Sequence, residues 1–426
     1  MDSLTTDILP RRAEAKLATL FREEAVIAIH GPRSVGKSTV LRRFAESHGT
    51  EVIDLDDLVV RDAVAANPSL VARAPTPVCI DEYQHVPEVL DAIKARLNRE
   101  GVRPGVAVLT GSTRQDAVPR TAQALTGRLH SFVILPLSQG EIAGVHEDLV
   151  ASLRVDPDAC TAAHPTSTTT RNDYAERIVA GGFPLALRRS GSLRNRWFDD
   201  YVRASIDRDA AELERVGQRQ ALGELLSLLA YRSAQILNVA NLANELQLNR
   251  KTVDGYLRLL EDLFLVFRLQ AWGKTLRARA TGSPKMHMVD SGLAARLLRI
   301  GPEKLTRLDP TALTEFGHLL ETFVVGELLK QVSWLEQQPI VGHWRTSDGD
   351  EVDLVIEFDD GRVLAFEVKA AERISSKDFG GLKKLRDGLG DRFIAGVALG
   401  LGTRSYTHDD RLHVMPVDRL WRPVRH

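Results

Sequence analysis

Short apolar runs alternate with amphipathic stretches through the first third of this 426-residue chain. The apolar runs are short enough to be buried strands, whereas the segments between them have helical spacing. The expected strands are residues 25–29, 51–55, 78–82, 106–110 and 132–135. This alternation predicts an α/β fold in which helices cover a parallel sheet.

The first expected strand leads into a glycine-rich sequence typical of a phosphate-binding loop, or P-loop. The loop reads Gly31-Pro32-Arg33-Ser34-Val35-Gly36-Lys37-Ser38-Thr39, and a helix is expected over 37–47. Gly31 and Gly36 let backbone N–H groups turn towards a polyphosphate, and Lys37 can reach its β and γ oxygens. The Ser38 hydroxyl can ligate Mg²⁺, and the helix dipole favours the anion. The sequence therefore predicts a nucleoside triphosphate site, with ATP and Mg²⁺ as its ligands.

Two further strand ends carry polar side chains. The third expected strand ends in Asp81 and Glu82, and Thr110 and Ser112 end the fourth. A parallel sheet places such side chains at its carboxyl edge, next to the P-loop. We expect Asp81 to help hold Mg²⁺ and Glu82 to polarise the attacking water, as phosphoryl transfer requires.

The P-loop, the acidic strand and the polar strand tip resemble those of AAA+ ATPases in order and approximate spacing. The resemblance implies that Asp81 is the metal residue, Glu82 the catalytic base and Thr110 or Ser112 the sensor, although many members have asparagine as sensor. Arg128 precedes the fifth strand, where the family often presents an arginine finger to a neighbouring subunit. This implies a homo-oligomer, and an ordinary surface arginine is the alternative.

Beyond residue 144 the alternation ends. Pro157, Pro165 and the tract Ser167-Thr168-Thr169-Thr170 indicate a flexible excursion, and helical spacing follows over 173–229. We expect four domains: a P-loop domain at 1–150, a linker and helical lid at 151–232, a winged-helix-like domain at 233–310 and an α/β C-terminal domain at 311–426.

Residues 239–265 have the pattern of two short helices joined by a tight turn, with Asn249 as N-cap of the second. The second helix would present Arg250, Lys251 and Arg258 outward. The next segment, 263–289, has no acidic residue and carries Arg268, Lys274, Arg277, Arg279 and Lys285. A basic β-wing beside a recognition helix is typical of duplex DNA binding. A protein-binding or internal packing module is the alternative.

The last quarter predicts a second acidic site on a β-hairpin. Its candidate residues are Glu321 in a helix at 313–330, Asp353 in a strand at 351–356, and Glu367 and Lys369 at the end of a strand beginning at 363. Because strand side chains alternate, Glu367 and Lys369 share a face, as a metal-dependent phosphodiesterase requires. This segment resembles the PD-(D/E)xK nuclease fold. The resemblance implies that Asp353, Glu367 and Glu321 bind a second Mg²⁺ and that Lys369 orients a water, with loss of cleavage activity as the alternative.

Other short sequence segments extend the resemblance to a known family over nearly the whole chain. They are Gly181-Gly182-Phe183-Pro184, residues 205–209, residues 283–293, and residues 349–353 with 367–369. Together they resemble a widespread prokaryotic family that joins an AAA+ ATPase to a C-terminal domain of unknown function. The resemblance implies a cytoplasmic ATP-binding protein from a family whose biological role is poorly defined.

Composition narrows the possibilities further. A hydrophobic fraction of 43% excludes a disordered chain, and a net charge of -1 means that a nucleic-acid surface must come from local clustering. Two cysteines are too few for a disulfide framework, and no uncharged apolar run of about 18 residues predicts a membrane span. The sequence thus predicts a cytoplasmic, ATP-dependent switch or motor. Its client is duplex DNA or, in the alternative, a protein bound by inactive docking domains.

Overall fold

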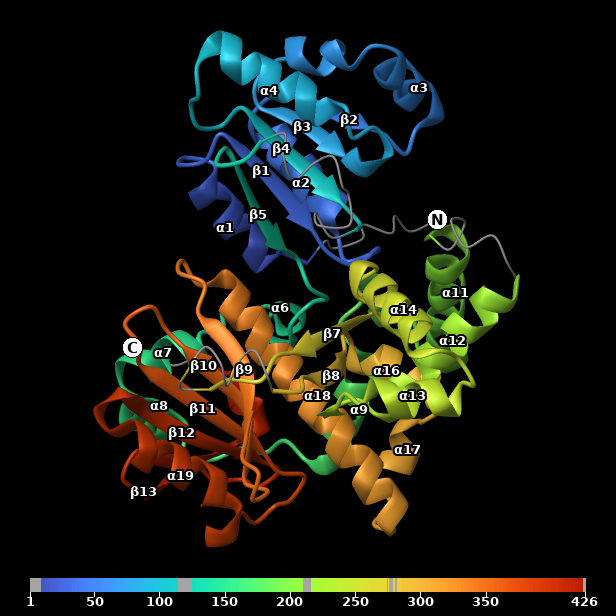
Figure 1. Ribbon diagram of the computed structural model, residues 1–426. Helices are drawn as coiled ribbons and strands as arrows, with labels where there is room; N and C mark the ends of the chain where they lie inside the picture. The colour runs from blue at the N-terminus through green and yellow to red at the C-terminus, as the bar shows by residue number, and fades with distance from the viewer. Residues whose placement is uncertain are drawn as a thin grey trace, which may run out of the picture. The chain divides into compact units, whose positions relative to one another are not determined.

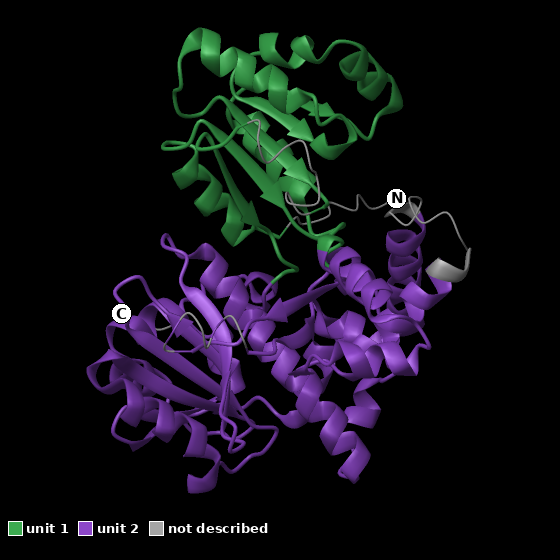
Figure 2. Ribbon diagram, in the orientation of Figure 1, with its two compact units in different colours: residues 1–137, 262–264 green, residues 138–261, 265–426 purple. Residues whose placement is uncertain are grey.

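The computed structural model describes residues 9–113, 125–209, 216–273, 275, 279 and 282–423. The chain divides into two compact units, residues 1–137 with 262–264 and residues 138–261 with 265–426 (Figure 2). The longer segment of the first unit ends at Leu137. The boundaries expected at residues 150, 232 and 310 remain predictions.

The first unit is a five-stranded parallel sheet covered by helices (Figure 1). Its elements are α1 (Arg12–Leu20), β1 (Val26–His30), α2 (Lys37–Ser47), β2 (Val52–Asp54), α3 (Leu58–Ala66), η1 (Pro68–Arg73), β3 (Val78–Asp81), η2 (Tyr83–His85), α4 (Val89–Glu100), β4 (Ala107–Gly111) and β5 (Leu129–Val133). The strand order is β2-β3-β4-β1-β5. The predicted helix-covered parallel sheet is therefore confirmed.

Alternating side chains of the central strands divide between the two faces of this sheet. Val26, Ala28, Ile80 and Leu109 belong to one apolar cluster with α3, η1 and α4. The strand residues between them are also fully buried, on the face that packs against α2. A sheet buried on both faces explains why its strands read as continuous apolar runs.

One strand differs from its predicted position. β5 covers Leu129–Val133, whereas the sequence predicted 132–135. β5 is an edge strand whose side chains are mostly half-buried or exposed, so it contains His130 and Ser131 and lacks the apolar signature of a central strand. The helix after the P-loop has its predicted bounds, Lys37–Ser47.

The second unit begins with α6 (Gln139–Ala143). Two helices, α7 (Leu149–Val155) and α8 (Pro157–Ala163), then lie where the sequence indicated a flexible excursion, and that prediction was wrong. Pro157 is at the start of α8, where its missing N–H costs nothing, and the Asp156 side chain accepts from Ala159 N at 2.9 Å. The serine- and threonine-rich tract is also held in place, because Ser167 and Thr169 donate to Asp418 at 2.6 and 2.7 Å.

Helices dominate the middle of the second unit. They are α9 (Arg171–Ala180), α10 (Pro184–Leu187), α11 (Gly191–Asp209), α12 (Val216–Tyr231), α13 (Val239–Glu245), α14 (Arg250–Asp262), α16 (Ser291–Leu297) and α17 (Pro302–Leu305). A small antiparallel sheet, ordered β6-β8-β7, contains β6 (Gln235–Ile236), β7 (Val266–Leu269) and β8 (Lys285–Met288). Asn249 accepts from Thr252 N at 2.8 Å and so caps α14 as expected. The assignment of this region as a winged helix remains a prediction.

A mixed six-stranded sheet forms the C-terminal part of the second unit. Its elements are β9 (Ile340–Arg345), β10 (Glu351–Glu357), β11 (Val363–Val368), η5 (Ser376–Phe379), α19 (Gly380–Leu389), η6 (Gly390–Arg392), β12 (Phe393–Gly400), β13 (Tyr406–Asp409), β14 (Leu412–Pro416) and η7 (Val417–Trp421), in the strand order β13-β14-β12-β11-β10-β9. β10 and β11 form the predicted hairpin, pairing Leu354 with Phe366.

The long helix α18 (Pro310–Trp334) connects this sheet to the helices. It packs against β10 and β11 and also against α9 and α16 (Figure 1). Since it is surrounded on most sides, α18 is apolar around most of its circumference rather than on one stripe. The helix therefore carries Glu321 to the C-terminal sheet.

Candidate functional site

The P-loop between β1 and α2 contains three residues with positive φ: Gly31 at +148°, Ser34 at 61° and Gly36 at +97°. A Cβ on Gly31 would lie 2.1 Å from the carbonyl oxygen of Ile134, so only glycine fits. Gly36 is the N-cap of α2, whose first N–H groups have no helical partner. These groups and the helix dipole favour an anion in the loop.

Lys37 is the first residue of α2 and folds back over the loop. Its Nζ donates to the carbonyl oxygens of Gly31 and Pro32 at 2.9 and 2.8 Å. Burial lowers the pKa of Lys37 to about 8, although the carboxylates of Glu82 and Asp81 oppose this shift. The lysine can therefore exchange two backbone carbonyls for the stronger charge of a phosphate.

Asp81 ends β3 beside the end of β4, as the sequence predicted. Its carboxylate accepts hydrogen bonds from the hydroxyls of Thr110 and Ser38. Burial raises the pKa of Asp81, and these two hydrogen bonds oppose the rise. Residues from the P-loop helix and from two strands thus meet at the carboxyl edge of the sheet.

Glu82 follows Asp81 in a left-handed backbone conformation with φ of 52°. Such a conformation costs a non-glycine residue about 1 kcal/mol and is common at functional sites. The Glu82 carboxylate accepts a hydrogen bond from Gln84, which also donates to the Ser112 hydroxyl at 3.1 Å. Glu82, Thr110 and Ser112 are all buried, and hydrogen bonds connect Glu82 with Thr110 directly and with Ser112 through Gln84.

Ser38 and Asp81 provide oxygen atoms of the kind that Mg²⁺ prefers. Within the described ranges, no group of three or more His, Cys, Asp and Glu side chains could hold a metal ion. An Mg²⁺ ion that arrives with a nucleotide needs only one or two protein ligands, because phosphate oxygens and waters complete its shell. The pair therefore fits a nucleotide-linked metal.

Sequence reasoning missed two residues of this site. Gln84 lies two positions after Glu82, which was its only sequence signal. Arg11 donates to the carbonyl oxygen of Val35 in the P-loop and, at 2.7 Å, to that of Leu135. Nothing in the sequence pattern connects Arg11 with a loop more than twenty residues away.

Arg128 immediately precedes β5 and donates to Asn98 Oδ1 at 2.6 Å. Because the sheet is parallel, the start of β5 is at the edge opposite the P-loop. Arg128 is therefore far from the nucleotide site of its own chain, and its role as an arginine finger remains a prediction.

The four C-terminal candidates of the sequence line one cavity of about 720 Å³. They are Glu321 from α18, Asp353 from β10, Glu367 from β11 and Lys369 just beyond it. Asp353 Oδ2 accepts from Val368 N at 2.9 Å, and Lys369 Nζ donates to Glu367 Oε1 at 2.7 Å. The expected clustering is present.

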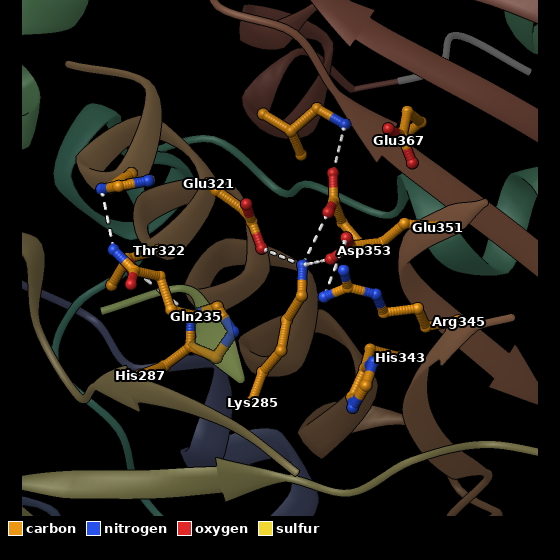
Figure 3. A network of polar contacts seen from close by, with 12 residues as sticks. Gln235, Lys285, His287, Glu321, Thr322, His343, Arg345, Glu351, Asp353 and Glu367 are labelled. Atoms are coloured by element: carbon orange, nitrogen blue, oxygen red, sulfur yellow. Dashed lines mark hydrogen bonds and ion pairs between the residues drawn. The ribbon is translucent and has the colours of Figure 1, made fainter. Parts of the chain in front are cut away.

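An unexpected residue stands at the centre of this cluster. Lys285 from β8 contacts Glu321 Oε1 at 2.7 Å and Asp353 Oδ1 at 2.8 Å, and it also pairs with Glu351 (Figure 3). Burial alone would lower the pKa of Lys285, but the carboxylates of Asp353, Glu321 and Glu351 outweigh it and raise the pKa. Since an ammonium already occupies the point where these oxygens converge, the donor set does not fit a second Mg²⁺ ion.

Burial raises the pKa of two carboxyl groups beside this lysine. For Glu367 the pKa rises to about 8, and the Asp353 charge adds to the effect of burial. For Glu321 burial is again the first cause. The cavity is therefore less negative at neutral pH than its number of carboxyl groups suggests.

Three of the five basic residues expected in the wing are paired with carboxylates in the structure. Arg268 pairs with Glu261 at 3.1 Å, Arg279 pairs with Glu357, and Lys285 is buried as described. The acidic partners of these three residues come from outside residues 263–289, so the absence of acidic residues within the segment does not leave them without compensating charge. Lys274 and Arg277 lie outside the described residues. Arg250, Lys251 and Arg258 are exposed on α14, as predicted.

Comparisons with known proteins separate the chain into three matched regions. Residues 23–143 match the model of an AAA domain, and residues 171–304 and 316–420 match two domains of unknown function, DUF8612 and DUF4143. An uncharacterized protein of Mycobacterium tuberculosis is 25% identical over 413 residues, which cover 96% of this chain and 84% of the relative. An uncharacterized protein of Haemophilus influenzae is 23% identical over 327 residues, covering 71% of this chain and 74% of that protein.

Two solved structures are also similar to the chain. The Walker-type ATPase of Pyrococcus abyssi has 14% sequence identity and a TM-score of 0.44, covering 69% of this chain and 97% of its own. The RuvB Holliday junction branch migration motor of Thermotoga maritima has 16% identity and a TM-score of 0.28, covering 68% and 95%. In the described residues, no helix is long and apolar enough to cross a membrane. The AAA match coincides with the P-loop unit and supports an ATP-binding P-loop ATPase of the AAA type.

Proposed function

We propose that the protein binds Mg²⁺-ATP in its first unit and hydrolyses it. The observation that carries this proposal is the convergence of Lys37, Ser38, Asp81 and Glu82 at the carboxyl edge of the parallel sheet. The residues come from separate segments, yet all lie where a parallel sheet with a P-loop binds its ligand. The AAA-domain match over residues 23–143 supports the same conclusion.

Each residue has a role that follows from its position. The loop N–H groups hold the phosphates, and Lys37 moves from its carbonyl partners to the β and γ oxygens. Ser38 and Asp81 hold Mg²⁺, which neutralises developing charge on the phosphates. Glu82 orients the attacking water, while Thr110 and Ser112 respond to the γ-phosphate through Asp81 and Gln84. ATP binding and hydrolysis then switch the site between two hydrogen-bonding states.

Calorimetry and turnover assays test this proposal. Purified protein should bind ATP with Mg²⁺, and Lys37→Ala should lose most of that affinity because the loop then lacks its cation. Glu82→Gln should retain binding but lose about 10² to 10³-fold in turnover. Lys94→Ala, in α4 and outside the site, is the matched control and should change neither. Undetectable ATP binding by folded wild-type protein would refute the proposal.

The client of this ATPase is proposed from the surface of the second unit. Exposed Arg250, Lys251 and Arg258 on α14 support duplex DNA as the client. The pairing of Arg268, Arg279 and Lys285 with carboxylates favours the second candidate, a protein client bound by inactive docking modules. ATP turnover with and without duplex DNA distinguishes the two.

Charge reversal provides the control for this comparison. If DNA is the client, it should stimulate ATP turnover at low salt. The triple variant Arg250→Glu, Lys251→Glu and Arg258→Glu should abolish that stimulation. Reversing three exposed arginines elsewhere in the unit, Arg188, Arg196 and Arg203, makes the same change in net charge and should leave it intact. No stimulation at any salt concentration would favour the protein client.

We also propose that Arg128 acts on the nucleotide of a neighbouring copy, because it lies opposite its own P-loop. Turnover per subunit should then rise with protein concentration as copies associate. Arg128→Ala should lower turnover without weakening ATP binding, and turnover that is independent of concentration would argue against a shared site.

A further inference from the structure

The C-terminal cavity contains a cation that the chain itself supplies. Lys285 is 2% exposed and reaches the cavity from β8, which lies outside the six-stranded sheet. Its three carboxylate partners come from two other elements: Glu321 from α18, and Glu351 and Asp353 from β10 (Figure 3). One ammonium group therefore joins the small sheet to both the long helix and the C-terminal sheet.

The number of partners suits an ammonium group. Lysine has three N–H donors, and the three carboxylates provide one acceptor each. The 2.7 and 2.8 Å contacts to Glu321 and Asp353 are ordinary lengths for charge-assisted N–H···O bonds. Divalent ions prefer several oxygen ligands around one point, which is the arrangement that Lys285 now fills.

The surrounding side chains show that the cavity still has unused binding capacity. Glu367 is 6% exposed and faces the cavity with Oε1 bonded to Lys369, while no described residue gives its Oε2 a hydrogen bond. His318 and His343 also lie near Lys285, and burial lowers the pKa of both, so they add no positive charge at neutral pH. A buried polar atom without a partner is costly unless a cation or water satisfies it.

We infer that Lys285 is a built-in cation that takes the place of a divalent metal between Glu321, Glu351 and Asp353. The native C-terminal site is then held together without metal. Removal of the lysine charge would then let these carboxylates, which as they now stand form no metal site among the described residues, gather around a divalent cation, with the charges of Lys369 and Arg345 left to oppose it.

This inference also assigns Lys285 a different role from the DNA contact expected of a basic wing. A buried ammonium with three carboxylate neighbours has no free donor for a phosphate backbone. Removing one partner from a buried ion network leaves uncompensated charge and is strongly destabilising. Lys285 therefore fixes β8 against α18 and β10, and the relation between these elements depends on it.

Mn²⁺ titration of the full-length, nucleotide-free protein tests the inference, with electron paramagnetic resonance to count bound ions. Wild type should show no Mn²⁺ binding that depends on Asp353. The Asp353→Asn variant should therefore give the same Mn²⁺ titration curve as wild type. Lys285→Met should gain one Mn²⁺ ion with an affinity at least about tenfold above wild type. The double variant Lys285→Met/Asp353→Asn should lose this gain.

Lys330→Met is the matched control, since Lys330 is also buried and pairs with the Glu327 carboxylate at 2.6 Å. It should gain no Mn²⁺ ion. Thermal melts give a second readout: Lys285→Met should melt at a lower temperature in EDTA and recover with Mn²⁺, whereas Lys330→Met should not recover. If wild type binds Mn²⁺ and Asp353→Asn abolishes that binding, the inference is overturned. This outcome does not depend on whether Lys285→Met folds. A folded Lys285→Met that binds no Mn²⁺ would also overturn it.

Discussion

The side-chain amide of Gln84 donates to the Ser112 hydroxyl at 3.1 Å and also to the Glu82 carboxylate. It therefore links the residue after β3 to the residue after β4. Ser112 and Thr110 are at the same strand end, and Thr110 donates to Asp81. The metal candidate Asp81 is thus tied to β4 through Thr110. The base candidate Glu82 is tied to it by its N–H, which donates to Thr110 at 3.4 Å, and through Gln84 to Ser112.

Gln84 is consequently expected to position Glu82. Gln84→Ala should lower kcat for ATP about tenfold and leave KM within about twofold, because the nucleotide contacts stay intact while the carboxylate loses its orientation. Steady-state ATP hydrolysis measures both constants. Gln338→Ala, an exposed glutamine in the second unit, should leave both unchanged. An unaltered kcat in Gln84→Ala would remove Gln84 from the site.

Gly31 is expected to be the least replaceable glycine of the first unit. In Gly31→Ala the new Cβ would meet the Ile134 carbonyl oxygen at 2.1 Å, so the loop must move. We expect a loss of roughly 3 kcal/mol in unfolding free energy together with loss of ATP binding. Gly49 also has positive φ, at +65°, but open space around it, so Gly49→Ala should cost only about 1 kcal/mol. Urea denaturation compares the two, and equal losses would contradict this account.

The lowered pKa of Lys37 makes ATP binding sensitive to pH. Because burial lowers the pKa to about 8, the free lysine is charged below that pH and neutral above it. The charged form binds the polyphosphate, so affinity should be constant at lower pH and fall by up to about tenfold per unit above pH 8. Lys37→Arg stays charged and should remove this slope. Calorimetric titrations across this range measure the effect, and the same slope in both proteins would assign it to another group.

The nucleotide site was predictable from sequence because its chemistry is concentrated in local motifs. The P-loop and its helix occupy consecutive residues, and Asp81 and Glu82 directly follow an apolar strand. Parallel pairing of the strands then brings the separate motifs to one edge. Strand β5 was misplaced because a partly exposed edge strand lacks the continuous apolar pattern of the central strands.

The position of Lys285 could not be predicted in the same way. It belongs to a segment without acidic residues, and its three partners are 36 or more positions away along the chain. Gly181, Gly182 and Asp290 belong to segments that resemble a known family, and the structure gives these residues a packing role. A Cβ on Gly181 would lie 2.3 Å from Asp290 Oδ1, and Gly182 N donates to Asp290 Oδ2 at 2.7 Å. Long-range contacts of this kind leave no periodic signal in the sequence.

Glu147 gives the second unit a stability that depends on pH. It is 1% exposed and accepts a hydrogen bond from Ser138, and burial raises its pKa from 4.5 to about 7 despite that bond. Below pH 4.5 the carboxyl group is protonated in both the folded and the unfolded chain. Between these two values the unfolded chain releases the proton while the folded chain keeps it, so its stabilising contribution is lost as pH rises.

The expected loss from Glu147 is roughly 2 to 3 kcal/mol between pH 4.5 and 7. Glu147→Gln cannot ionise, so its unfolding free energy should fall less steeply with pH than that of wild type over this window. Urea denaturation of both proteins at several pH values measures the difference. Glu176→Gln, which changes an exposed glutamate of α9, is the control and should follow the wild-type slope. Parallel curves for wild type and Glu147→Gln would mean that the pKa of Glu147 in the folded protein is not raised above its value in the unfolded chain.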